Sequence, residues 1–205
     1  MSWNQPQRVA KREVMLNKNM IRQSHQAGTT LLEVLVTVVI LAFGLLGLAG
    51  LEMKTRSIEM ESYQRSQAMV ILNDMVNRLQ MARGNAADYV ADGALVGAEE
   101  NNCSALTGSA FDLCEWGNAL IGAGETLSGS KVGAMIGARG CIAEIQTPDN
   151  TPGACTPGIY EITVTWQGMF KTKAPTNACA ENTYGDDSLR RAISLRVSAG
   201  TGSCV

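Results

Sequence analysis

Apolar and polar positions first mark out a long helix near the start of the chain. Residues 34–51 read VLVTVVILAFGLLGLAGL and carry no charged side chain, which is about the length that crosses a bilayer core as a helix. Neither Pro nor Gly occurs between Leu51 and Gly84, so one helix is expected from about Thr29 to Arg83, with Gly84 as its stop signal. At 1.5 Å per residue this helix would be roughly 80 Å long.

The second half of the predicted helix carries an apolar stripe. Met69, Leu72, Val76 and Leu79 recur at spacings of three, four and three, the pattern of one helix face. We expect this face to pack against the rest of the chain. Its use as a binding face for a partner helix is the alternative.

Strict alternation predicts strands in the last third of the chain. Ile162, Val164 and Trp166 alternate with polar residues, and so do Ile193, Leu195 and Val197. With residues 141–145 they give three antiparallel strands, and a fourth stays open. Residues 84–140 are rich in Gly, Ala, Ser and Asn and predict a long loop region with one short helix near 109–121. The fold class is therefore α+β, a long N-terminal helix, its first half transmembrane, packed on a small antiparallel sheet.

Charge gives the predicted membrane helix a direction. Before Gly28 the chain has five basic residues and one acidic residue, and the remainder has 12 basic and 18 acidic residues. By the positive-inside rule, residues before the apolar segment stay in the cytoplasm and the C-terminal half is exported. A cleaved secretory signal peptide is the alternative, although its apolar region would be unusually long.

All six cysteines lie in the second half of the chain: Cys103, Cys114, Cys141, Cys155, Cys179 and Cys204. None forms a C-x-x-C pair of the kind that metal sites favour, so disulfides in an oxidising compartment are the better interpretation. Six cysteines allow fifteen connectivities. Chain proximity suggests sequential pairing, Cys103–Cys114, Cys141–Cys155 and Cys179–Cys204.

The segment GTTLLEVLV, residues 28–36, resembles the class III signal of type IV pilins and type II secretion pseudopilins. A basic leader precedes its glycine, one acidic residue follows, and the apolar segment comes next. GLLGLAGLE, residues 44–52, with GIYEITVTWQG, residues 158–168, and RRAISLRV, residues 190–197, resembles PilV-type minor pilins. Thr29 stands where the family usually has Phe.

The resemblance implies a processing site. A prepilin peptidase of the family cuts after the glycine and N-methylates the next residue, so Gly28 would end the leader and Thr29 would begin the mature chain. Residues 1–28 would be the leader, 29–51 the transmembrane half of the helix, 52–83 its periplasmic half and 84–205 the body. The implied location is the inner membrane, with a single pass and a cytoplasmic N-terminus, and later the pilus fibre at the cell surface.

Glu33 is the one acidic residue at the start of the apolar segment. A charge at membrane depth costs on the order of 2.5–3.5 kcal/mol and usually has a partner. We expect it to pair with the amine exposed at Thr29, in its own chain or, as the family implies, in a neighbouring subunit. The alternative is a first-turn acid that stabilises its own helix start. Gly44, Gly47 and Gly50 are either tolerated in the membrane helix or permit local unwinding and close packing in a fibre.

The sequence offers little for catalysis. The one histidine, His25, lies in the predicted leader, which removes histidine-based triads and common zinc sites from the mature chain. Residues 124–131 mimic a phosphate loop with its last two residues reversed, and Asp186 and Asp187 could join a calcium site, but neither pattern has the required context or spacing. The acidic body excludes a nucleic-acid surface. We predict no enzyme, no catalytic residues, no cofactor and no metal.

The predicted function is assembly. The resemblance implies a minor pilin that helps to initiate, and to cap, a type IV pilus through helix-bundle packing. Its partners would be other minor pilins, the major pilin, the prepilin peptidase, the inner membrane and, as a further candidate, a tip adhesin. A type II secretion minor pseudopilin is the alternative with the same architecture. A periplasmic enzyme or binding module on an uncleaved signal anchor is the alternative of another class.

Overall fold

The computed structural model describes residues 30–90, 95–128, 130–131, 133, 135–153 and 155–200. The chain divides into two compact units, residues 1–47 and 48–205. Of the first unit, the structure describes the beginning of a helix. The second unit holds the rest of that helix and every other element, and we call it the body.

Helix α1 spans Leu31–Met81. The expected start at Thr29 lies outside the described residues, and the helix ends two residues before the expected Arg83. A short 3-10 helix, η1, follows at Arg83–Tyr89. The α-helix therefore ends three residues before Gly84, the expected stop signal, which lies within η1.

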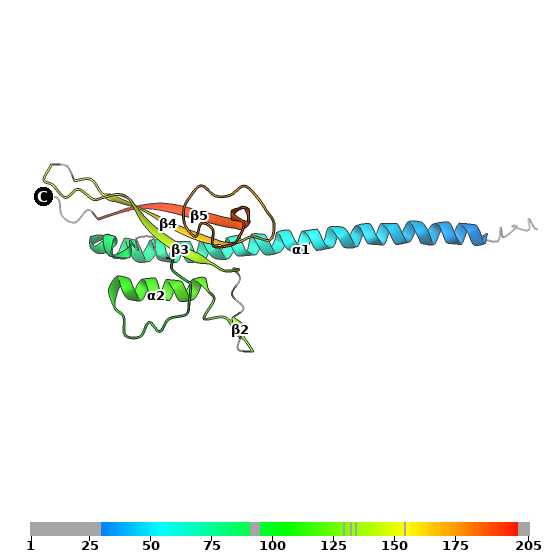
Figure 1. Ribbon diagram of the computed structural model, residues 1–205, viewed down its shortest axis with the longest axis horizontal. Helices are drawn as coiled ribbons and strands as arrows, with labels where there is room; N and C mark the ends of the chain where they lie inside the picture. The colour runs from blue at the N-terminus through cyan, green and yellow to red at the C-terminus, as the bar shows by residue number, and fades with distance from the viewer. Residues whose placement is uncertain are drawn as a thin grey trace, which may run out of the picture. The chain divides into compact units, whose positions relative to one another are not determined.

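The main sheet of the body has three antiparallel strands, β3 (Arg139–Gln146), β4 (Gly158–Gln167) and β5 (Arg190–Ala199), in the order β3-β4-β5. Ile142 pairs with Ile162, and Ile162 pairs with Leu195, so β4 lies between two edge strands (Figure 1). The α+β, pilin-like fold class is confirmed, with a long N-terminal helix packed on a small antiparallel sheet.

Shorter elements occupy the region between α1 and β3. Helix α2 covers Gly108–Leu120, close to the expected 109–121, and β1 (Thr126–Leu127) pairs with β2 (Ser130–Lys131) as a separate hairpin. Trp116 of α2 donates from Nε1 to the carbonyl of Ile71 at 3.0 Å, which holds α2 beside α1 (Figure 1). Another 3-10 helix, η2 (Asp187–Leu189), precedes β5.

The core lies between α1 and the inner face of the sheet. Leu72, Val76 and Leu79 of the predicted stripe are buried there. Met69 was wrongly assigned to the stripe, because it is 52% exposed and its neighbour Ala68, about 100° around the helix, is fully buried instead. Tyr160, Ile162, Val164 and Trp166 of β4 and Met75 of α1 complete the contact.

Close contact between α2 and the sheet depends on a residue without a side chain. An added Cβ at Gly140 of β3 would lie 2.2 Å from the Trp116 ring. The large indole of Trp116 is fully buried at this point. Glycine is therefore required at residue 140 for α2 to approach the sheet.

The outer face of the sheet is covered as well. Thr163 and Thr165 of β4 are 3% and 0% exposed, although alternation places them away from α1. Tyr184, in the loop between β4 and β5, lies 3.1 Å from the Thr165 hydroxyl through its own hydroxyl oxygen. This loop, residues 168–189, therefore covers the outer face and buries β4 on both sides.

The cysteine pairing corrects two of the expected disulfides. The structure joins Cys103 to Cys114 and Cys141 to Cys179, so the expected Cys141–Cys155 and Cys179–Cys204 pairs are wrong. Cys155 is also disulfide-bonded, and Cys204 lies outside the described residues.

Strand geometry explains this correction. Cys141 lies on β3 and pairs with Thr163, whereas Cys155 follows the end of β3 in the hairpin loop. A strand rises about 3.3 Å per residue, so residue 146 is already roughly 16 Å from residue 141, beyond the reach of a disulfide. Cys141 points to the outer face, where the covering loop brings Cys179 to a Cα–Cα distance of 5.9 Å.

Arg190 organises the covering loop. Its side chain is 1% exposed and forms a double hydrogen bond with both carboxylate oxygens of Asp187, at 2.7 and 2.8 Å. It also donates to the backbone carbonyls of Pro175, Asn177 and Cys179. The buried guanidinium is therefore paired and satisfied by the loop that it holds in place.

Candidate assembly site at the start of the long helix

Thr30 caps the N-terminus of α1. The backbone N–H of Glu33 donates to Thr30 Oγ1 at 3.3 Å and to the Thr30 carbonyl at 3.0 Å. Thr30, Leu31, Leu32 and Glu33 form the T-x-x-E pattern of a capping box, in which the threonine side chain satisfies a helix N–H that has no partner within the helix. The sequence contained this signal, but the capping role of Thr30 was missed.

Glu33 lies in the first turn of α1. Its backbone is engaged by Thr30, but its carboxylate makes no hydrogen bond or ion pair with any residue that the structure describes. The first turn of a helix favours a negative charge through its free N–H groups. The carboxylate thus lies at the helix start and is available to an outside cation.

The apolar part of α1 in the first unit has no protein cover among the described residues. The 18-residue window of α1 with a mean hydropathy of 2.7 is 0% buried, and α1 is long and apolar enough to cross a membrane. Leu31 is 84% exposed and Phe43 is 72% exposed. Apolar surface of this extent is stable in lipid or against other apolar helices.

The structure describes the three predicted glycines of the membrane helix but not the two predicted processing residues. Gly28 and Thr29, the predicted processing residues, lie outside the described residues. Gly44, Gly47 and Gly50 are all within α1, and an added Cβ at any of the three would meet no atom within 4 Å. Space within the chain therefore does not require these glycines, and their close-packing role stays a hypothesis.

The acidic pair at Asp186 and Asp187 is neutralised by the protein itself. Lys171 lies 2.6 Å from Asp186, and Arg190 lies 2.7 Å from Asp187. The hydrogen bond from Lys171 lowers the pKa of Asp186, and that from Arg190 lowers the pKa of Asp187. The carboxylates that a calcium ion would need as ligands are thus already paired with cationic side chains.

The sequence that mimics a phosphate loop forms a different structure. Residues 126–127 and 130–131 pair as the antiparallel strands β1 and β2, whereas a phosphate loop joins a strand to the N-terminus of a helix. Within the described residues, no group of three or more His, Cys, Asp or Glu side chains could hold a metal ion. The geometry of the described chain thus gives its strongest functional signal at the start of α1.

Comparison with known proteins points to the same segment. Residues 23–49 match the family model of the prokaryotic N-terminal methylation motif, and the match includes Gly28, Thr29 and Glu33. Searches of curated proteins and of solved structures each gave no match. The motif supports a type IV pilin-like or pseudopilin protein, and in general it implies assembly with other pilins and processing by a prepilin peptidase.

Proposed function

We propose that this protein is a PilV-type minor pilin that helps to initiate and cap a type IV pilus. The observation that carries the proposal is the methylation motif at residues 23–49, together with the helix α1, whose apolar half has no cover in the described chain, and the α+β body that follows. Such a helix can pack into a bundle with the helices of other subunits. Assembly needs no chemistry beyond this packing.

The proposal includes a processing step and a topology. Cleavage follows Gly28, Thr29 becomes the mature N-terminus, and the helix stays attached. Residues 29–51 cross the inner membrane with the N-terminus in the cytoplasm, residues 52–83 continue the helix in the periplasm, and residues 84–205 form the exported body. The disulfides of the body support this side of the membrane, because disulfides persist in oxidising compartments.

Mass spectrometry of the mature N-terminus tests the processing step. We expect a methylated amine at Thr29 in the wild-type protein and an uncleaved chain in a Gly28→Glu variant. A Gly84→Glu variant, altered at an exposed glycine in the body, is the matched control and is expected to be cleaved normally. A mature start beyond Leu51 would contradict the pilin proposal.

A deletion strain tests the function itself. Loss of the gene should reduce the number of surface pili seen by electron microscopy, while the major pilin is still processed. The processed subunit should co-purify with other minor pilins. Normal pili together with a defect in protein secretion would instead identify a type II secretion pseudopilin.

A further inference from the structure

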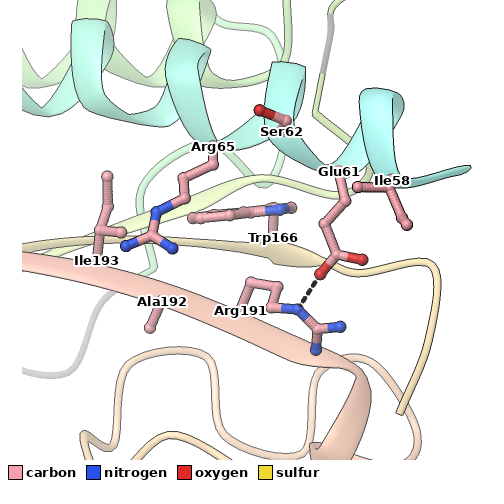
Figure 2. A pocket seen from close by; sticks show the side chains of 8 residues that line it. All are labelled: Ile58, Glu61, Ser62, Arg65, Trp166, Arg191, Ala192 and Ile193. Carbon is pink, nitrogen blue, oxygen red and sulfur yellow. Dashed lines mark hydrogen bonds and ion pairs between the residues drawn. The ribbon is translucent and has the colours of Figure 1, made fainter. Parts of the chain in front are cut away.

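A cavity of about 460 Å³ opens in the body between α1 and the edge strand β5. It is lined from α1 by Ile58, Glu61, Ser62 and Arg65, from β4 by Trp166, and from β5 by Arg191, Ala192 and Ile193. Figure 2 shows Glu61 and Arg65 of α1 reaching toward β5 across this space. None of these residues belongs to the assembly site described above.

The charges around the cavity do not cancel. Glu61 forms an ion pair with Arg191 (Figure 2). Arg65 reaches from α1 toward β5 beside Ile193, and it has no hydrogen bond or ion pair with any described residue. One guanidinium thus faces the cavity without an acidic partner among the residues that the structure describes.

Apolar side chains form the rest of the cavity wall, beside the charged and polar ones. Ile58 and Ile193 lie on opposite sides, and the Trp166 ring lies between α1 and β5 at the back (Figure 2). Trp166 is 2% exposed, and its indole Nε1 has no hydrogen-bond partner in the described chain. Because this nitrogen is itself buried, the part of the Trp166 ring that lines the cavity is apolar.

The strand beside the cavity has an open edge. β5 pairs with β4 over its whole length, and no described segment pairs with its other edge. The opposite edge of the sheet differs, because Val96 exchanges two backbone hydrogen bonds of 2.9 Å with Gly140 of β3. Leu195, in the middle of β5, is 41% exposed. An open edge of this kind is a template for pairing with another strand.

The alternation of β5 connects its edge to the cavity. Arg191 and Ile193 face α1, whereas Ala192 points away from the helix (Figure 2). A strand added to β5 would also point every second side chain toward α1. Two such side chains, two residues apart, would enter the cavity.

We propose that β5 and this cavity bind an extended segment of a partner subunit, which adds as a strand to the open edge. One of its side chains is apolar and packs against Ile58, Trp166 and Ile193. The other, two residues away, is acidic and pairs with Arg65. Strand addition supplies backbone hydrogen bonds, and the cavity supplies specificity. Only the identity of the partner, another pilin-like subunit, rests on the proposed function.

The charges argue against a second copy of this strand as the occupant. β5 has the sequence RRAISLRVSA and carries Arg190, Arg191 and Arg196 without an acidic residue. These three arginines are already paired with Asp187, Glu61 and Glu161, so a second β5 would offer Arg65 no carboxylate and would add further guanidinium groups near it. Like charges across an interface oppose binding, so an acidic segment is the complementary partner.

Peptide binding to the full chain in detergent micelles tests the site without any partner subunit. The probe is a fluorescein-labelled nine-residue peptide of alternating valine and threonine, with one valine replaced by glutamate; the comparison peptide has lysine there. We expect the glutamate peptide to bind about tenfold more tightly in a fluorescence anisotropy titration. Equal affinity for the two peptides, or no binding of either, would overturn the proposal.

Charge reversal tests whether Arg65 is the residue that binds the acidic side chain of the peptide. Arg65→Glu should reverse the preference between the two peptides. Arg196→Glu is the matched control, because Arg196 is an arginine of β5 that contacts Glu161 on the outer face, away from the cavity, and the preference of this variant should stay as in the wild type. A wild-type preference in Arg65→Glu would contradict the proposal.

Cross-linking in cells identifies the partner. A photoreactive benzoylphenylalanine at Leu195 should yield an adduct with a segment of another pilin-like subunit that carries apolar and acidic residues two positions apart. The same probe at Ile145, which is 48% exposed on β3, should give no such adduct. An adduct with a second copy of this chain, or equal amounts of adduct from Leu195 and Ile145, would contradict the proposed strand addition. Failure of the pilin proposal would appear separately, as a wrong mature N-terminus.

Discussion

Arg78, in the last turn of α1, donates from Nη1 to Oδ1 of Asp112 on α2 at 2.9 Å. The other oxygen of the same carboxylate accepts a hydrogen bond from the Tyr89 hydroxyl. Tyr89 belongs to η1 and is 2% exposed. One carboxylate of α2 therefore connects the end of α1 with the segment that follows it.

This connection predicts a loss of stability in alkali. Burial, and then the hydrogen bond to Asp112, raises the pKa of Tyr89 to about 12 from its ordinary value of 10.0. A raised pKa means that folding favours the neutral phenol, so this stabilisation is complete below pH 10 and is lost as the pH rises from 10 to 12. Two pKa units correspond to about 2–3 kcal/mol.

Urea denaturation of the full chain in detergent at pH 9 and pH 11 measures this effect. The Tyr89→Phe variant removes the titrating hydroxyl and is the matched control. We expect the free energy of unfolding to fall more between the two pH values in the wild type than in the variant. An equal fall in both proteins would show that Tyr89 does not cause it.

The role of Glu33 can be separated from that of the helix cap. Glu33→Ala should leave the processed chain in the membrane but sharply reduce surface fibres, since an amine buried without its acid typically costs roughly 3–5 kcal/mol. Thr30→Val removes the capping hydroxyl, at a cost of about 1 kcal/mol, and keeps the carboxylate. Fibres should therefore persist in Thr30→Val.

Immunoblots of the processed subunit and fibre counts by electron microscopy give the two readouts. If Glu33 acts only within its own helix start, both variants should resemble each other, because a dipole interaction contributes about 0.3–1 kcal/mol. Normal fibre numbers in Glu33→Ala would remove the support for an intersubunit ion pair.

The disulfides give a direct chemical prediction. Non-reducing peptide mapping of the full chain should recover one peptide pair joining Cys103 to Cys114 and another joining Cys141 to Cys179. Counting the remaining cysteines, we predict a Cys155–Cys204 peptide as well. Recovery of Cys141 joined to Cys155 would contradict the described pairing.

Arg190 should be sensitive even to a conservative change. Lysine keeps the charge of Arg190 but cannot form the double hydrogen bond with Asp187 or reach all the loop carbonyls. We expect Arg190→Lys to destabilise the body by about 1.5–3 kcal/mol, the contribution of a hydrogen bond to a charged group. Arg196→Lys is the control, because Arg196 is 64% exposed in its pair with Glu161, and such surface pairs contribute about 0–1 kcal/mol. The midpoints of urea denaturation measure both effects. Similar midpoints for Arg190→Lys and Arg196→Lys would contradict the prediction.

The sequence predicted the elements of the fold because their periodicities are local. The alternation of Ile162, Val164 and Trp166 predicted the inner face of β4, and the spacing of Leu72, Val76 and Leu79 predicted the buried face of α1. The burial of Gln64, in a polar stretch of α1, was not predictable: it is 0% exposed, and neither amide atom has a partner in the described chain. Hydrophobic spacing carries no information about such a residue.

The burial of the outer face of the sheet could not be predicted from a local pattern either, because it depends on a loop that is distant in the sequence. Thr163 and Thr165 have the polar identity of exposed strand positions, but the loop at residues 168–189 folds back over them. The Cys141–Cys179 bond and the burial of Arg190 follow from that return of the chain. At the candidate site, the motif around Gly28 and Glu33 was visible in the sequence, and the cap at Thr30 was visible but missed.

The Cys141–Cys179 bond also constrains the order of events in biosynthesis. In a chain made from its N-terminus, Cys103, Cys114 and Cys155 all meet an oxidant before Cys179, so every disulfide open to Cys141 until then is a non-native one. Exchange of such a bond requires attack by a free thiolate. Correct maturation therefore requires either that oxidation waits until β3 and β4 have paired or that a thiol–disulfide isomerase corrects the early product. The supply of this subunit is then set by oxidative folding as well as by synthesis.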